Sequence, residues 1–385
     1  LKERVLLYAA SPLFNGNADY AKFANEDGTL LFAPKDDSKW GKAAAAAKEA
    51  IDKIEGSSYY GLYYSDEPDN GYRNYMELFL PSKKWNKEYI FARNQGTGYS
   101  DNIHQEKCMA ANGMGGWSGL CPTQELVDAY EMANGSTPII GYNADGTPII
   151  NGASGYSETG FAATAGKHYP AGVYNMYVGR EPRFYASINF NGQQWRGRQL
   201  EFWQGGKDGI NVSKVDYCCT GYLLRKTADE GVDVINGKGG MKEASILFRV
   251  GSLYLDYAEA LNEAEGPVDD VYKYVDAIRK RAGLPGLAKG LDKDKMRERI
   301  QHERQIELAF EAGHRYFDCH RWKIAEKTDN GYMHGMNITA TNKGDYSKRS
   351  TVGDSRVFEK KHYLFPIPQS EMDKRIGLVQ SPYWE

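Results

Sequence analysis

Apolar residues recur at helical spacing near the start of the chain and again after residue 242. An apolar run ends a first helix over residues 5–10, and residues 40–54 combine five consecutive alanines with an apolar edge. In residues 243–264 and 268–282 the apolar side chains fall on one side of a helix and most charged side chains on the other. The pattern therefore predicts amphipathic helices over these four ranges.

One stretch, Met296–Trp322, does not separate charged from apolar positions in the usual way. Three glutamates fall inside the apolar arc of its first helix rather than opposite it. Buried carboxylates are tolerated when cations and backbone donors meet them, and arginines follow closely in the sequence. We predict a helix held by arginine–carboxylate pairs, a turn at Gly313 and a second helix that begins near Arg315. The predicted ion-pair residues are Glu303, Glu307, Glu311, Arg304, Arg315 and Arg321.

The same glutamates stand beside histidines, which raises the alternative of metal or acid–base chemistry. His302 and Glu303 are not followed by the second histidine of a zinc-binding H-E-x-x-H motif. Glu311 and His314 have the spacing of a di-iron ligand pair, but a di-iron site needs that motif twice and two more carboxylates. Structural ion pairs are the favoured interpretation, and no metal site is predicted.

Helical periodicity fades in the middle of the chain, where glycines multiply and short apolar runs indicate isolated strands around one short helix. The later helix pairs resemble tetratricopeptide units of about 34 residues, which bury their faces against their neighbours. We predict a mainly α fold, in which a right-handed tetratricopeptide-like scaffold carries a large loop-rich insertion with short strands. The predicted parts are scaffold helices over residues 1–56, the insertion over 57–242, helix pairs over 243–327 and a C-terminal packing tail over 328–385.

Charge and hydropathy exclude several classes of protein. The chain has 48 basic and 51 acidic residues among its 385, a balance that does not favour nucleic-acid binding. No apolar run approaches the ~20 residues that cross a bilayer, and the opening segment does not have the pattern of a signal peptide.

Cysteine and aromatic usage add two further points. The five cysteines include no C-x-x-C pair, which argues against a zinc knuckle or redox motif, while a Cys108–Cys121 disulfide stays open. The 28 tyrosines and 7 tryptophans each combine an apolar face with a polar edge, which suits a half-exposed binding surface. Many of these tyrosines are also expected to line contacts between helices.

Several motifs in this chain resemble those of one known family. Residues 303–322, ERQIELAFEAGHRYFDCHRW, resemble the C-terminal signature of the SusD/RagB family, the glycan-capturing lipoproteins of the Gram-negative outer membrane. Other matches occur in the family's order: LYAASPLFNG from residue 7, PTQELVDAYEMANG from 122, GREPRF from 179, TGYLLRK from 220 and YLFPIP from 363. Ser381 and Tyr383 depart from the family's Q-N-P-G-W ending.

The resemblance implies a protein without catalytic activity that captures oligosaccharide or polysaccharide and delivers it to a SusC-like TonB-dependent transporter. It also implies that the protein is lipid-anchored in the cell outer membrane and faces the exterior. The anchor, the secretion signal and the first scaffold helices would belong to an N-terminal portion absent from this chain. No cofactor and no nucleic-acid partner are predicted, and a structural calcium ion stays open.

Candidate ligand contacts are sought in the insertion, because there the aromatic residues stand beside Gly, Asn and Arg. The apolar faces of sugars stack on Trp or Tyr rings, and their hydroxyl groups need a polar rim. Trp117, beside four flexible neighbours, is the first choice, whereas hairpin packing competes with ligand contact for Trp195 and Trp203. The predicted ligand contacts are Trp117, Tyr99, Arg93, Asn94, Tyr64, Tyr72, Trp195 and Trp203.

Two other functions remain open from the sequence. A tetratricopeptide-type module would bind a peptide or protein on the concave helical face. A glycoside hydrolase would need two carboxylates facing each other across a cleft at about 5 to 10 Å, whereas the dense carboxylates here form one internal row.

Overall fold

The computed structural model describes residues 1–80, 83, 85–94, 99–238, 244–311, 313–374 and 376–384. Its main helices are α1 (Lys2–Ala10), α2 (Ser38–Glu55), α3 (Gly71–Glu77), α4 (Tyr99–Met109), α5 (Gln124–Ala129), α6 (Pro182–Ser187), α7 (Val250–Glu265), α8 (Asp269–Arg281), α9 (Lys293–Glu307) and α10 (His314–Arg321). Short helices α11 (Ala325–Thr328), α12 (Lys343–Tyr346) and α13 (Gln369–Met372) follow. None of the described helices is both long and apolar enough to cross a membrane.

The strands form five small antiparallel sheets of two strands each within the described residues. They pair β1 (Tyr89–Asn94) with β8 (Ala244–Arg249), β2 (Ile139–Tyr142) with β3 (Pro148–Ile150), β4 (Ile188–Phe190) with β7 (Tyr222–Leu224), β5 (Gln194–Trp195) with β6 (Arg198–Gln199), and β9 (Gly331–Met336) with β10 (Arg349–Arg356). The molecule is therefore mainly helical with scattered two-stranded sheets, and the predicted fold class is confirmed.

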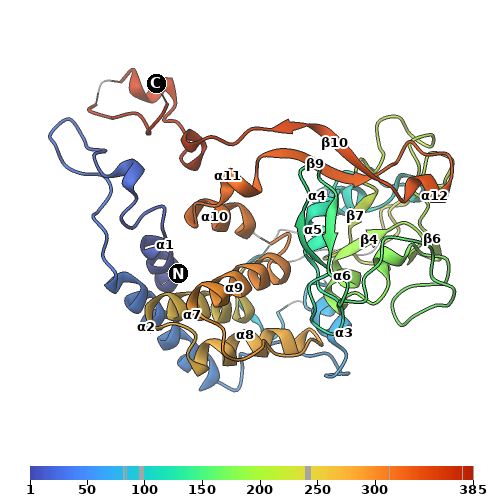
Figure 1. Cartoon of the computed structure of the whole chain (residues 1–385), viewed down its shortest axis with the longest axis horizontal. Coiled ribbons are helices and arrows are strands. Elements are labelled where there is room, and N and C mark those ends of the chain that lie inside the picture. The colour runs from blue at the N-terminus through green and yellow to red at the C-terminus, as the bar shows by residue number, and fades with distance from the viewer. Residues whose placement is uncertain are drawn as a thin grey trace.

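A helical scaffold forms one end of the molecule, where α1, α2, α7, α8 and α9 lie together (Figure 1). The alanine-rich face of α2 lets it pack closely on α7, because small side chains allow two helix backbones to approach. One core cluster joins Ala43, Ala47 and Ile51 of α2 to Leu253 of α7 and Met296 of α9.

The loop-rich insertion forms the other end and has its own core (Figure 1). This core is aromatic: the Tyr177 ring lies 4.4 Å from the Phe190 ring and 6.2 Å from the Phe184 ring, measured between centroids. The β9–β10 hairpin runs from the helical end to the insertion in Figure 1, and Arg349 on β10 binds Asp128 of α5 at 2.7 Å. The loops of the insertion are thus supported by this aromatic core and by the β9–β10 hairpin.

The predicted helix over residues 243–264 is wrong at its start. Residues 244–249 form β8, which pairs antiparallel with β1 so that Arg249 lies opposite Tyr89, and α7 begins at Val250. The extended conformation is favoured because β1 offers an unpaired edge. It also directs the Arg249 side chain into the buried charge cluster described next.

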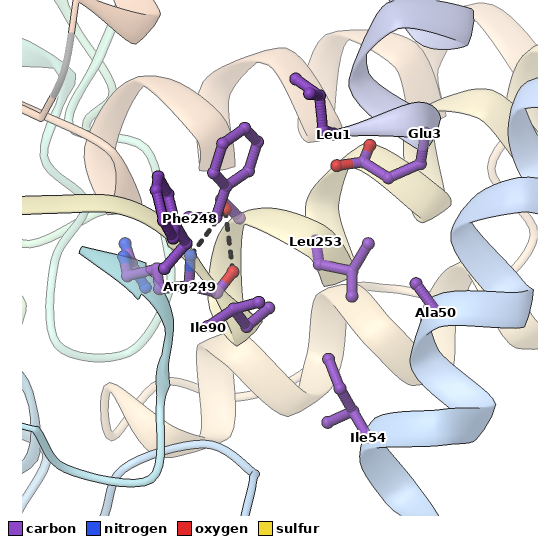
Figure 2. Close-up of a pocket in the computed structure, with 10 residues that line it drawn as sticks. Leu1, Glu3, Ala50, Ile54, Ile90, Phe248, Arg249 and Leu253 are labelled. Carbon is purple, nitrogen blue, oxygen red and sulfur yellow. Dashed lines mark hydrogen bonds between the residues drawn. The ribbon is translucent and has the colours of Figure 1, made fainter. Parts of the chain in front are cut away.

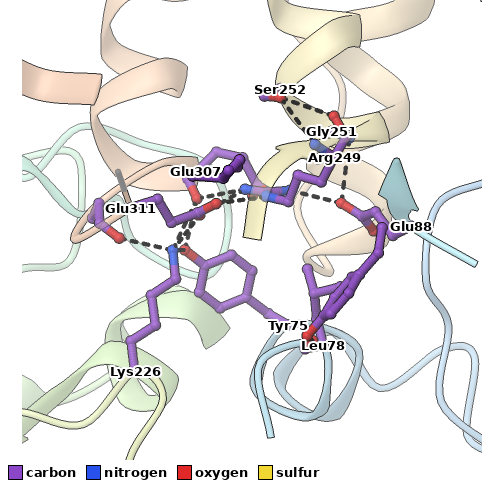
Figure 3. Close-up of polar contacts among 12 residues, drawn as sticks. Tyr75, Leu78, Glu88, Lys226, Arg249, Gly251, Ser252, Glu307 and Glu311 are labelled. Atoms are coloured by element: carbon purple, nitrogen blue, oxygen red, sulfur yellow. Dashed lines mark hydrogen bonds and ion pairs between the residues drawn. The ribbon is translucent and has the colours of Figure 1, made fainter. Parts of the chain in front are cut away.

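Glu303 and Glu307 of α9 are buried, and Glu311, just beyond the end of α9, is partly buried. All three are paired as predicted, but with cations other than the predicted ones. Arg249 binds Glu307 at 2.9 Å and Glu311 at 2.7 Å, and Glu88, which precedes β1, at 2.7 Å (Figure 3). Lys226 of the insertion binds Glu311 at 2.6 Å, and Figure 3 shows it approaching from below the glutamates. The other cations that meet this row are Arg183, Arg279 and Arg281.

The arginines that were predicted to pair with the three glutamates bind other carboxylates or, in the described part of the chain, none. Arg304 binds Asp256 at 2.5 Å and Asp318 at 2.9 Å, and Arg321 also binds Asp318, at 2.8 Å. Arg304 and Arg321 therefore belong to a second buried cluster between α7, α9 and α10. Arg315 is half-buried and makes no ion pair within the described residues, so its assignment to the network is wrong.

All five cysteines are free thiols, so the Cys108–Cys121 disulfide that the sequence left open is absent. Cys121 lies instead near Cys218, with their sulfur atoms 3.9 Å apart.

Candidate functional site

A polar, aromatic-walled pocket of about 360 Å³ lies in the insertion. Its volume falls in the range of small-molecule sites, and its walls come from sequence-distant segments. Tyr72 is carried by α3, the Gln193–Gln194 wall by β5 and the turn before it, and the third wall by the loop of residues 166–170. We refer to it as the Tyr72 pocket; its lining residues are Tyr72, Gly166, Lys167, His168, Tyr169, Pro170, Gln193, Gln194, Arg225 and Glu230.

Tyr72 and Arg225 form the centre of this pocket. The Arg225 Nη2 donates a hydrogen bond of 2.6 Å to the Tyr72 hydroxyl, and the guanidinium lies 4.7 Å from the centroid of the Trp195 ring. Cation–π contact with Trp195 fixes the guanidinium plane, because a desolvated cation gains energy over an aromatic face. The tyrosine ring is held in a defined position by this arrangement.

His168 adds a second flat ring to the wall. It stacks on Tyr72 with centroids 4.8 Å apart and an interplanar angle of 29°. Burial, with smaller effects from the charges of Lys167 and Arg225, lowers the pKa of His168 to about 4. The imidazole is therefore neutral at physiological pH, with one ring nitrogen as donor and the other as acceptor. Such a ring suits a hydroxyl group, which can both donate and accept.

Three buried N–H groups at or beneath the pocket lack a hydrogen-bond partner within the described residues. They are Gln193 Nε2, Arg225 Nε and Trp195 Nε1. Buried donors are usually satisfied, and unsatisfied ones cost about 1 to 3 kcal/mol each. These donors are buried in and beneath the walls of the pocket and do not open onto its cavity.

The sequence-predicted contacts do not form one site. Tyr72 lines the pocket, but Trp195 lies beneath it with 2% of its surface exposed, so no free face remains for stacking on a sugar. Trp195 is therefore a packing residue of the insertion core. Trp203 is half-buried against the same core, and the Lys343 ammonium lies 5.0 Å from its ring centroid.

Trp117 packs on α4 away from the lining of the Tyr72 pocket. Its ring lies 5.2 Å from the His104 ring and 5.3 Å from the Lys107 ammonium, and its backbone N–H donates to the Lys107 carbonyl. These contacts anchor the glycine-rich loop to the helix. Because the ring is only half-buried, ligand contact at Trp117 stays a prediction.

The remaining predicted contacts are scattered. Arg93 lies exposed on β1, and Tyr64 is 36% exposed in the segment that precedes α3. The side chains of Tyr99 and Asn94 lie outside the described residues.

Sequence reasoning missed most of the lining of the Tyr72 pocket. His168 stands among small and charged residues, and Gln193 and Gln194 sit in a short turn, so no periodic pattern marks them. Arg225 belongs to the T-G-Y-x-x-R-K motif, but the sequence did not indicate which residue its guanidinium would contact. Their assembly depends on α3 packing against α6, which sequence spacing does not reveal.

A second pocket, of about 320 Å³, is almost wholly apolar and lies between α1, α2, α7 and the β1–β8 pair (Figure 2). Ala50, Ile54, Ile90, Phe248 and Leu253 supply its walls. The Glu3 carboxyl points toward this apolar space in Figure 2, and its Oε2 has no partner within the described residues. Burial, together with the charge of Asp256, raises the pKa of Glu3 to about 8.

Replacing Glu3 by glutamine should stabilise the protein at high pH. The folded-state pKa of Glu3 exceeds its ordinary value of 4.5, so its contribution to stability is full below pH 4.5 and is lost as pH rises toward 8. We expect Glu3→Gln to raise the free energy of unfolding by about 1 to 3 kcal/mol at pH 8 and to change it little at pH 4. Urea denaturation at both pH values measures this difference. Glu49→Gln, on an exposed helix face, is the control, and equal effects at both pH values would contradict the assignment.

Comparison with known proteins gives a consistent result. The model of the family described as the SusD family matches residues 80–384. Two curated relatives from Formosa agariphila are similar over shorter stretches. SusD-like protein P25 is 42% identical over 82 residues, which is 20% of this chain and 15% of P25. SusD-like protein P2 is 29% identical over 154 residues, which is 37% of this chain and 26% of P2.

Solved structures extend the similarity to the whole chain. The structure of the protein named BT4246 matches with a TM-score of 0.80 and 26% identity, and covers 100% of this chain and 70% of its own. A SusD-like carbohydrate-binding protein from Bacteroides fragilis NCTC 9343 matches with a TM-score of 0.64 and 24% identity, over 87% of this chain and 60% of its own. The latter likeness concerns the fold alone. The chain spans less than a third of the length of the curated relatives it matches.

Proposed function

Because the chain belongs to the SusD family, we propose that it is a cell-surface protein that binds oligosaccharide or polysaccharide in the Tyr72 pocket. The observation that carries this proposal is the pairing of stacked flat rings, Tyr72 and His168, with a rim of amide, guanidinium and carboxylate groups. Sugars need this combination, because their C–H faces are apolar while their hydroxyl edges must be hydrogen-bonded.

Charge in the Tyr72 pocket favours neutral or acidic sugars. Lys167 and Arg225 supply two cations, and Glu230 supplies one carboxylate. A protonated amino sugar would meet a net positive lining, whereas a hydroxyl or carboxylate would meet the donors it needs.

We further propose that the bound glycan is passed to a SusC-like TonB-dependent transporter, and that the protein is held on the outer membrane by an N-terminal lipid anchor outside this chain. Family membership supports both statements. The carbohydrate binding ascribed to the Bacteroides fragilis neighbour supports the class of ligand.

Binding without hydrolysis is part of the proposal. Glycosidases require two carboxyl groups flanking the bond that is cleaved. Glu230 is the one carboxylate that lines the Tyr72 pocket in the described part of the chain, and the dense carboxylates of α9 are engaged by buried arginines. Stacking and hydrogen bonding are therefore the available chemistry.

Native affinity electrophoresis tests the proposal. The protein is run through gels that contain starch, xylan, laminarin, mannan or polygalacturonan, and we expect retarded migration in at least one of them with no release of reducing ends. Serum albumin run in the same lanes controls for sieving. Unretarded migration in all five gels, together with binding of peptides in a pulldown, would favour the peptide-binding alternative.

A further inference from the structure

A third pocket, of about 260 Å³, lies on the helical scaffold. Five segments meet there: the turn after α1, then α2, α7, α9 and the end of α10. None of the ligand contacts predicted from the sequence lines it. Its lining residues are Pro12, Trp40, Glu259, Glu263, Arg297, Gln301 and Trp322.

Two tryptophans form walls of this scaffold pocket, and they differ in how firmly they are engaged. Trp322 is 8% exposed, its Nε1 donates to Glu259 at 2.7 Å, and the Arg321 guanidinium lies 4.7 Å from its ring centroid. Trp40 is half-buried with one side packed against the scaffold core, and within the described residues its indole has neither a hydrogen bond nor a contact with another aromatic ring. The Trp322 side chain is therefore held in one position, whereas the Trp40 ring has a face available to a ligand.

The polar groups of the pocket offer donors and acceptors without a net charge. Glu259 is paired with Arg321, at 2.7 Å for its Oε2, and Glu263 is held by Arg297 at 2.5 and 2.6 Å. The Gln301 amide has no hydrogen-bond partner within the described part of the chain, so its N–H and C=O groups are both available.

These features discriminate between two ligand classes. A cage of tryptophans with unpaired carboxylates would attract a quaternary ammonium group. Here two arginines neutralise the two carboxylates, so the electrostatic attraction for a cation is largely cancelled. Hydroxyl groups, which donate and accept at once, match the remaining paired oxygens, guanidinium N–H groups and free amide.

We propose that the scaffold pocket is a second carbohydrate subsite, which holds one sugar ring against Trp40 with its hydroxyls on Gln301, Glu263 and Arg297. The inference rests on the proposed function, since it assigns the same ligand class to a separate place. A polymer that engages both subsites of one chain would be held more tightly than by either subsite alone.

The test uses the same five polysaccharide gels with wild type, Trp40→Ala, Gln301→Ala, Tyr72→Ala and the Trp40→Ala/Tyr72→Ala double variant. We expect Trp40→Ala to weaken retention about two- to tenfold, from the ~0.5 to 1.5 kcal/mol typical of an aromatic contact. The double variant should lose retention. Trp40→Phe keeps a flat ring and should keep most of the binding, and Lys42→Ala, exposed on the same helix, controls for surface changes.

The outcomes separate this inference from the proposed function. If Tyr72→Ala weakens retention while Trp40→Ala and Gln301→Ala migrate as wild type, the second subsite is overturned and the proposed function stands. If Trp40→Ala weakens retention and Tyr72→Ala does not, the second subsite stands and the Tyr72 pocket fails. Wild type that is retained in no gel overturns both. Trp40-dependent binding of a fluorescent polyproline peptide, with polysaccharide retention unchanged, would make the pocket a peptide site instead.

Discussion

Replacing Glu307 by glutamine is expected to lower the free energy of unfolding by about 3 to 5 kcal/mol, the usual cost of breaking a buried ion pair. Glu307 is fully buried and meets Arg183, Arg249 and Arg281. Burial alone would raise the pKa of Glu307, but the attraction of the three arginines outweighs it and lowers the pKa to about 2. Urea denaturation followed by circular dichroism measures the loss.

The pH dependence of the same variant provides a second readout. Because the folded-state pKa of Glu307 lies below its ordinary value of 4.5, its stabilising contribution is full above pH 4.5 and is lost as pH falls toward 2. Wild type should therefore lose stability across that window, and Glu307→Gln should lose less. Glu49→Gln removes an exposed pair and should cost less than about 1 kcal/mol. A Glu307→Gln loss as small as that of the control would show that the buried network does not hold the insertion on the scaffold.

Replacing Tyr72 by alanine is expected to weaken polysaccharide retention about tenfold. The substitution removes the ring that stacks on His168 and the hydroxyl that accepts from Arg225. Loss of an aromatic contact and of the burial it provides corresponds to about 1.5 kcal/mol, and 1.4 kcal/mol is a factor of ten in affinity. Isothermal titration with oligosaccharides cut from the retained polymer measures the change.

Two further variants define what the tyrosine does. Tyr72→Phe keeps the ring and loses the hydroxyl, so most of the affinity should remain. Trp117→Ala tests the residue that the sequence placed first. Binding confined to the Tyr72 pocket requires wild-type affinity from this variant, because the Trp117 ring packs on α4 outside the lining of that pocket. Weakened binding by Trp117→Ala together with wild-type binding by Tyr72→Ala would move the site to the Trp117 loop.

The fold could be predicted from the sequence because its elements are local. Five alanines and an apolar edge specify α2, and Gly313, at φ 73°, caps the start of α10 close to the predicted turn. The preceding helix, α9, ends earlier than predicted, at Glu307, so Glu311 lies in the connection between the two helices. The start of α7 could not be predicted. Residues 244–249 carry apolar side chains that fit a helix as well as a strand, and the partner that selects the strand, β1, lies about 150 residues earlier in the chain.

The candidate site was less predictable than the fold. Trp195 and Tyr72 were both singled out as aromatic residues in a loop-rich region, yet the structure buries Trp195 beneath the pocket and places Tyr72 on its wall. Composition cannot separate these two cases, because an aromatic residue in a loop can anchor the loop or face a ligand. His168 and Gln193 had no sequence signal at all.

By itself, the sequence indicated that the late helix carries buried, cation-paired carboxylates, because glutamates recurring inside an apolar arc are tolerated there when cations meet them. Tertiary structure decided which arginines pair with them. Arg304 follows Glu303 directly and so points to a different face of the helix, where it binds Asp318. Glu303 instead meets Arg183 of the insertion, 120 residues earlier, and Arg279 of α8, since the inner face of the helix is covered by both the insertion and the scaffold.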